Sequence, residues 1–177
     1  EGCEFWLQEI DKPYERWNVL ARFSWEKPVS DSKVSFSEFG LDPAKEYAVY
    51  EFWSKRFLGV FKYSFPVSAQ EAKGVCVYAI RERLGRPQIL STSRHISQGA
   101  VDLVSVKWSP ATKILSGKSK VIKNDPYSMT VLLNGYGKPT SVVVDCKSTE
   151  FTLKGDVLVL KVLPKATKTV AWSIGLS

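Results

Sequence analysis

The chain has 177 residues, about the length of one domain at the usual ~150 residues per domain. Hydrophobic residues make up 44% and charged residues 24% of it, which excludes a disordered chain and a fibrous repeat. No apolar run approaches the ~18 residues that a membrane helix needs, so we expect a soluble chain with no membrane partner. A complete eight-fold βα barrel, at roughly 250 residues, is excluded by length.

The first residue is Glu1 rather than Met, which predicts a piece of a longer protein. Residues 1–15 are expected to be a connecting segment or an edge strand from a preceding domain. From Trp17 to Trp25, large apolar side chains occupy alternate positions, as in a strand with one buried face. Similar runs predict further strands at Tyr47–Trp53, Val60–Phe65, Val75–Ile80, Ile89–Thr92, Val101–Trp108, Ser119–Ile122, Ser128–Leu133, Ser141–Asp145, Phe151–Leu153, Asp156–Leu163 and Thr167–Ile174.

Turn-forming residues separate these runs, for example in Asn124-Asp125-Pro126 and Lys154-Gly155-Asp156. Many short strands at regular turn spacing indicate an antiparallel sandwich or barrel. The sequence therefore predicts an all-β fold, an antiparallel β-sandwich of two packed sheets with Greek-key-like connections, as a single domain over residues 16–177.

The formal charge is +7 and the isoelectric point about 9.3, which permits a polyanionic partner without requiring one. Because the basic residues are scattered, a solvated surface is the simpler interpretation, and no nucleic-acid partner is expected. The three cysteines form no CxxC pair, and there is a single histidine, too few soft ligands for a structural zinc site. Buried, reduced thiols at Cys76 and Cys146 would favour a reducing, intracellular location.

The sequence shows no recognisable arrangement of catalytic residues. The lone histidine, His95, lies in a Ser-rich segment that contains no nucleophile elbow, and we expect a structural role for it. Acidic residues give no reason for pairing any two as in a glycosidase. Asp102 and Glu51 lie inside strand-like runs, where each needs a partner such as Arg94 or Lys107. We expect no catalytic residue, no metal and no cofactor within this chain.

Six tryptophans dominate the aromatic residues. Strand parity places Trp17, Trp25 and Trp172 in the core. The run Tyr50–Trp53 carries aromatic side chains at both parities, which predicts burial on both faces, one of them against a neighbour.

The segment Trp17–Gly59 resembles the C-terminal β-sandwich of the α-galactosidase (melibiase-like) glycoside hydrolases. The resemblance rests on Trp17-Asn18-Val19-Leu20-Ala21-Arg22-Phe23-Ser24-Trp25, Val34-Ser35-Phe36, Phe39-Gly40-Leu41, Glu46-Tyr47-Ala48-Val49-Tyr50-Glu51-Phe52-Trp53 and Phe57-Leu58-Gly59, and it covers about a quarter of the chain. Ser24 stands where Asn is common in that family, and Glu51 where Asp is common. The resemblance implies a non-catalytic accessory domain that packs against a preceding catalytic (βα) barrel of the same polypeptide and, in some members of that family, contacts carbohydrate.

Three interpretations of the exposed residues remain open. If Trp6 and Trp53 face the barrel, the isolated chain exposes an apolar patch and should self-associate. In a stand-alone carbohydrate-binding module, exposed Trp or Tyr rings would stack on sugars while polar side chains bond their hydroxyls. A basic, polyanion-binding domain is the third alternative. The candidate contact residues are Trp6, Trp53, Arg94, His95, Gln98 and Trp108.

Overall fold

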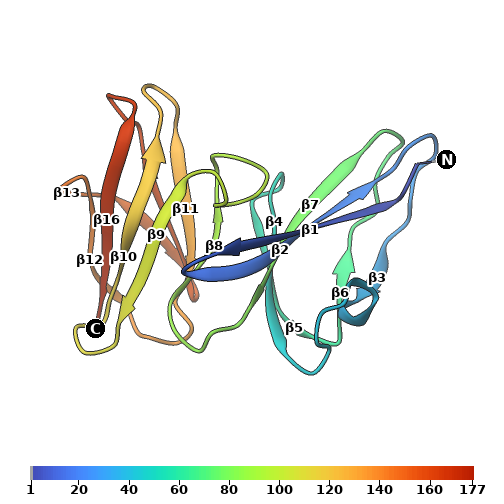
Figure 1. The fold of residues 1–177 in the computed structure, drawn as a ribbon, viewed down its shortest axis with the longest axis horizontal. Helices are drawn as coiled ribbons and strands as arrows, with labels where there is room; N and C mark the ends of the chain where they lie inside the picture. The colour runs from blue at the N-terminus through green and yellow to red at the C-terminus, as the bar shows by residue number, and fades with distance from the viewer. Residues whose placement is uncertain (1) are drawn as a thin grey trace. The chain divides into compact units, whose positions relative to one another are not determined.

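A computed structural model describes residues 2–177 (Figure 1). It confirms the predicted fold class, because the strands pair in antiparallel fashion into an all-β, sandwich-type fold whose one short helix is a single 3₁₀ turn. The chain divides into two compact units; the first ends at Arg83 and the second extends from Leu84 to Ser177. In the described residues, each sheet belongs to one unit.

The first unit is built on a five-stranded sheet with the order β1-β2-β7-β4-β5. A two-stranded sheet, β3-β6, and the 3₁₀ turn η1 pack on one face of it. The elements are β1 (Phe5–Lys12), β2 (Glu15–Phe23), β3 (Ser32–Ser35), η1 (Phe36–Phe39), β4 (Glu46–Glu51), β5 (Arg56–Lys62), β6 (Ser64–Val67) and β7 (Val75–Glu82). The core between the layers consists of Leu20, Val34, Phe36, Tyr47, Val49, Phe65, Val67, Tyr78 and Ile80.

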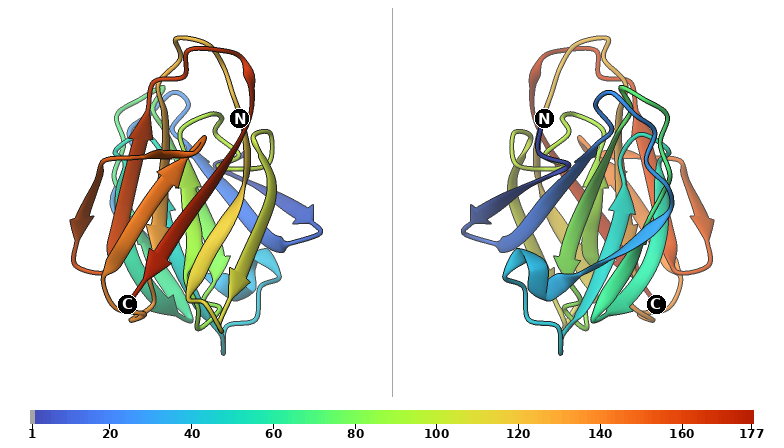
Figure 2. Two further views of the ribbon diagram at one scale, coloured as in Figure 1. Left: turned by 90° about the vertical axis from the view of Figure 1, so that its left-hand side faces the viewer. Right: turned by 90° about the vertical axis from the view of Figure 1, so that its right-hand side faces the viewer.

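The second unit is a sandwich of a five-stranded sheet, β13-β12-β16-β10-β9, and a four-stranded sheet, β14-β15-β11-β8. Its strands are β8 (Gln88–Thr92), β9 (Leu103–Ser109), β10 (Ile114–Val121), β11 (Tyr127–Leu132), β12 (Pro139–Val144), β13 (Lys147–Ser148), β14 (Phe151–Lys154), β15 (Val157–Val162) and β16 (Lys168–Leu176). Strands far apart in sequence are neighbours, as expected for Greek-key-like connections: β10 pairs with β16, and β11 with β8. In Figure 2, left, β10 (yellow) and β16 (red) lie side by side.

Two expectations differ from the structure. Instead of one domain over residues 16–177, the chain has two compact units, and the segment 1–15 contributes the edge strand β1 of the first. The predicted strand Val60–Phe65 is also divided: Tyr63 has a positive φ of 68°, and the chain turns there from β5 into β6, which belongs to the other sheet. A run of apolar residues does not reveal such a change of sheet.

Across residues 2–177, no helix has the length and apolar character needed to cross a membrane.

Candidate interaction site

The five-stranded sheet of the first unit has one face on the core, and its second face carries several large apolar side chains. Because side chains alternate along strands, Trp17, Ala21 and Phe23 of β2 point to the face opposite Leu20. Part of this second face is buried, with Trp17 at 1% exposure. The rest carries large exposed side chains.

A row of register partners crosses this second face from β1 to the residue that follows β4, and its member on β7, Val77, is buried at 3% exposure. Trp6 of β1 is the register partner of Ala21 on β2, and Ala21 is the partner of Val77 on β7. The row continues to Phe52, whose backbone N–H donates to the carbonyl oxygen of Val77 at 2.8 Å. Three interstrand spacings of ~4.8 Å place the ends of this row about 14 Å apart.

Aromatic rings occupy both ends of the row. Trp6 is 61% exposed, with its ring edge-to-face against Phe23 at 6.0 Å. Trp53 is 56% exposed and packs edge-to-face on Phe52 at 4.9 Å. We call these four residues the aromatic strip. The structure thus brings the predicted contact residues Trp6 and Trp53 to the same end of one sheet.

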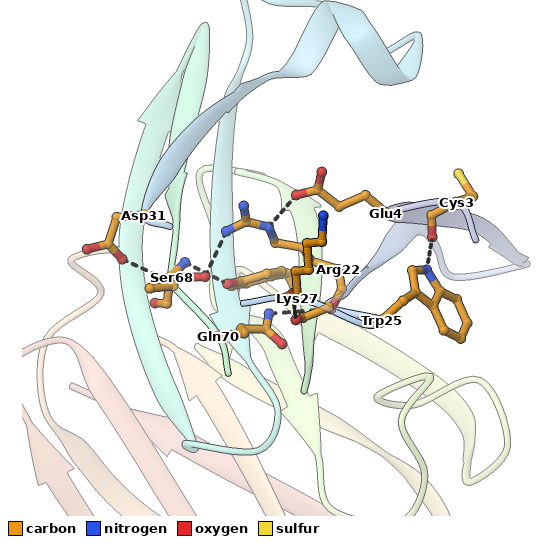
Figure 3. A network of polar contacts seen from close by, with 11 residues as sticks. Cys3, Glu4, Arg22, Trp25, Lys27, Asp31, Ser68 and Gln70 are labelled. Carbon is orange, nitrogen blue, oxygen red and sulfur yellow. Dashed lines mark hydrogen bonds and ion pairs between the residues drawn. The ribbon is translucent and has the colours of Figure 1, made fainter. Parts of the chain in front are cut away.

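Trp25 is not a core residue, contrary to the prediction, since it is 44% exposed. One face of its ring stacks on Phe23 at 5.2 Å, and a Cβ on Gly2 would lie 2.4 Å from its six-membered ring. Its Nε1–H donates to the carbonyl oxygen of Cys3 at 3.0 Å (Figure 3). The prediction applied strand alternation to Trp25, but β2 ends at Phe23 and the chain leaves the sheet there. Alternation therefore gave the wrong environment for Trp25. Trp25 holds the first residues of the chain in place.

Arg22 anchors the same region from the core side. Its side chain is 4% exposed, and it donates to Glu4 Oε1 at 2.9 Å and to the carbonyl oxygen of Ser68 at 2.8 Å (Figure 3). The hydroxyl of Tyr78 accepts a hydrogen bond from the Ser68 amide, and burial raises the pKa of Tyr78 well above its usual value. Burial likewise raises the pKa of the Cys76 thiol on β7. Nothing in this network faces solvent with an activated group.

The loop after β8 gathers three predicted contact residues, Arg94, His95 and Gln98, but two of them are engaged within the protein. Arg94 forms an ion pair with Asp125. Gln98 is fully buried with a positive φ of 56°, and its backbone N–H donates to the carbonyl oxygen of His95. His95 is exposed, and its Nδ1 accepts a hydrogen bond from the Ser97 amide at 3.1 Å. A ligand could reach the remaining edge of the imidazole, which is a small contact.

Trp108, the remaining predicted contact residue, is half-buried on β9 with its ring edge-to-face on Tyr136 at 5.0 Å. Leu103, at the other end of β9, is five residues away, or about 17 Å along a strand. Trp108 therefore lies too far along the strand to join the His95 loop in one small-molecule site.

The two buried carboxylates have neutral partners instead of the predicted cations. Asp102 is fully buried and accepts hydrogen bonds from Thr92 Oγ1 at 3.0 Å and from the Tyr127 hydroxyl at 2.7 Å. Glu51, 5% exposed, accepts hydrogen bonds from backbone amides, including those of Val77 and Ser54. Hydroxyl and amide donors therefore satisfy the oxygens of both side chains without a cation. Sequence reasoning had no means of finding these hydroxyl and amide donors.

The cysteines also differ from the expectation, because Cys146 is exposed and Cys76 half-buried; all three are free thiols. Within the described part of the chain, no three His, Cys, Asp or Glu side chains gather as metal ligands would. Comparison of the sequence with protein-family models and with curated proteins finds no match.

Proposed function

We propose that the chain is a non-catalytic accessory β-sandwich of an α-galactosidase-like glycoside hydrolase, and that the aromatic strip is the surface that packs against the catalytic barrel. The observation that supports the proposal is the strip itself. Two tryptophans are more than half exposed, one on β1 and one two residues past the end of β4 of the same sheet, and such side chains are unusual on a surface that faces only water. Tryptophan side chains that a partner buries commonly contribute 2 kcal/mol or more each to binding.

The resemblance adds support from the same unit. Its residues lie in β2, β3, η1, β4 and β5, all before Arg83, and several are core residues of the first unit, among them Leu20, Phe36 and Tyr47. The strip flanks these strands. The surface proposed to pack against the barrel and the core residues that carry the resemblance therefore lie in the same compact unit.

The decisive test begins with the coding sequence directly upstream of Glu1. An in-frame, barrel-sized stretch with a carboxylate at the ends of two of its strands supports the proposal, and a start codon or a signal peptide immediately before Glu1 contradicts it. In the longer protein, the double variant Trp6→Ser/Trp53→Ser should then lower the melting temperature of the barrel and the α-galactosidase activity that survives heating. Leu163→Ser, which removes a 64% exposed apolar residue of the second unit, is the matched control and should leave both unchanged.

Carbohydrate binding is a second candidate, favoured by the same exposed rings, because an aromatic face can stack on a sugar ring. It predicts millimolar-to-micromolar affinity, about 4–8 kcal/mol, of the 177-residue chain for a glycan. Calorimetric titration with a panel of galactosides and other glycans would reveal it, and Trp6→Ser/Trp53→Ser should abolish the heat. Flat titrations across the panel would remove this candidate.

A further inference from the structure

The excess of positive charge is confined to one unit. From Leu84 to Ser177 there are thirteen lysines and arginines and five carboxylates, a net charge of +8. The residues up to Arg83 contain twelve lysines and arginines and thirteen carboxylates, a net charge of −1. The overall +7 is therefore a property of the second unit.

Four of the five carboxylates in the second unit are buried or engaged within the protein, and the fifth, Glu150, is exposed. Asp102 is fully buried, and Asp125 and Asp145 are each paired with a cation, Arg94 and Lys168. Asp156 accepts hydrogen bonds from the backbone amide of Gly135.

Strand register shows where free lysines gather. On β10, Ser119 faces the interior, where Trp172 donates to its hydroxyl at 2.9 Å. Lys118 and Lys120 alternate with it and so point to the outer face of the five-stranded sheet. Lys107 of β9 is the register partner of Ser116 and shares that face. All three lysines are exposed, and none has an ion-pair partner among residues 2–177.

Small side chains surround these lysines. Ser105 and Ala171 flank Lys118, Thr169 lies beside Lys120, and Ser173 lies beside Ser116. We call this surface the basic face; it consists of Ser105, Lys107, Ser116, Lys118, Lys120, Thr169, Ala171 and Ser173, none of which is acidic or aromatic. Asp145 adjoins it, since its backbone N–H donates to the carbonyl oxygen of Ala171, but its carboxylate is paired with Lys168. Spacings of about 6.7 Å along a strand and 4.8 Å across strands place the Cα atoms of the three lysines within about 14 Å.

We propose that the basic face binds an acidic polysaccharide, a linear polymer that carries carboxylate or sulfate groups. Its charge complements the lysines, while the serine and threonine hydroxyls can both donate to and accept from sugar hydroxyls. Single-stranded nucleic acid fits less well, because its binding surfaces rely on aromatic rings for base stacking. Duplex DNA is commonly read by a helix or ribbon that enters a groove, and a flat sheet face presents neither. This proposal is independent of the accessory function and uses a different unit.

The test measures binding of the 177-residue chain to fluorescein-labelled heparin and polygalacturonate by anisotropy, with uncharged dextran, duplex DNA and polyglutamate for comparison. Each charge contact contributes about 0.7 to the logarithmic salt slope in single-stranded polyanions. Three lysines then predict a slope near 2, or roughly 15- to 20-fold weaker binding at 200 mM than at 50 mM NaCl.

The variant Lys107→Gln/Lys118→Gln/Lys120→Gln should weaken binding at 50 mM NaCl by at least tenfold. Lys123→Gln/Lys138→Gln/Lys154→Gln removes the same charge from exposed positions of the same unit outside the basic face, and should weaken it less than threefold. Replacing the three face lysines by arginine should retain binding, and unchanged melting temperatures establish that the variants are folded. No binding to either acidic polysaccharide, equal losses in the two glutamine variants, or tighter binding of DNA or polyglutamate at equal salt would each overturn the proposal.

Discussion

Tyr127→Phe should destabilise the second unit by about 2–3 kcal/mol, because it removes a hydroxyl that donates to the buried Asp102 carboxylate. Asp102 is fully buried, so water cannot replace the lost donor without opening the sandwich. Asp102 and Tyr127 are also joined to Ser119 and Trp172, since the Tyr127 hydroxyl lies 3.1 Å from Ser119 Oγ. The network therefore ties β11 of one sheet to β10 and β16 of the other.

Peptide-resolved hydrogen exchange is the suitable assay, because two compact units need not unfold together and a single unfolding curve would mix them. A loss of 2–3 kcal/mol corresponds to exchange about 30- to 150-fold faster at the most protected amides of the second unit. The amides of the first unit should be unaffected. Tyr136→Phe is the control, since the Tyr136 hydroxyl has no hydrogen bond in the described residues, and its effect should stay within about 0.5 kcal/mol. A change below 0.5 kcal/mol in Tyr127→Phe would refute the idea that hydroxyl donors sustain the buried carboxylate.

Three further predictions concern other parts of the fold. Gly117→Ala should cost the second unit about 1–3 kcal/mol, measured by hydrogen exchange at its most protected amides, because the added Cβ would lie 2.1 Å from the Ser105 carbonyl oxygen and 2.5 Å from the Trp172 ring; unchanged exchange would contradict this packing. Trp25→Ala should speed hydrogen exchange at residues 3–6 while leaving β16 protected, whereas Trp25→Phe, which retains a ring, should have a smaller effect; equal exchange in both variants would argue against the stacking. Burial raises the pKa of Cys76 and Tyr78, so the folded state keeps protons that the unfolded state releases, and the free energy of unfolding should fall as the pH rises above about 9. Urea unfolding at pH 8 and pH 10.5 measures this loss, and equal stability at the two values would contradict it.

The strands and fold class could be predicted because alternation of apolar residues reports directly which face of a strand is buried. Trp17 and Trp172 were assigned to the core on this ground, and they are 1% and 3% exposed. Parity gives no information once the chain leaves a sheet, which explains Trp25 and the turn at Tyr63. Nor does it say which strands pair. The division at Arg83 follows from which strands pair, since each sheet lies within one unit. The net charge changes there from −1 to +8, but a change in charge does not report which strands share a sheet.

The candidate site was predictable only in part. Trp6 and Trp53 were singled out as large aromatic residues near possible domain contacts, but their common row depends on the register of β1, β2, β7 and β4. The partners of Asp102 were expected to be Arg94 or Lys107. Lys107 instead points to the outer face, and Arg94 pairs with Asp125. Opposite charges close in sequence are an unreliable guide when a buried carboxylate can be satisfied by hydroxyl groups on other strands.

Salt can separate the two proposed surfaces, because their driving forces respond to it in opposite directions. Binding through Lys107, Lys118 and Lys120 should weaken steeply with NaCl, because releasing counterions into a more concentrated salt solution gains less entropy. Contacts through Trp6 and Trp53 bury apolar area, which salting-out ions such as sulfate strengthen. An interaction of this chain that persists in 0.5 M sodium sulfate and is lost in Trp6→Ser/Trp53→Ser therefore belongs to the aromatic strip. One that weakens roughly 15- to 20-fold between 50 and 200 mM NaCl and is lost with the three lysines belongs to the basic face. A single interaction that needed both surfaces and both conditions would contradict the assignment of separate roles to the two units.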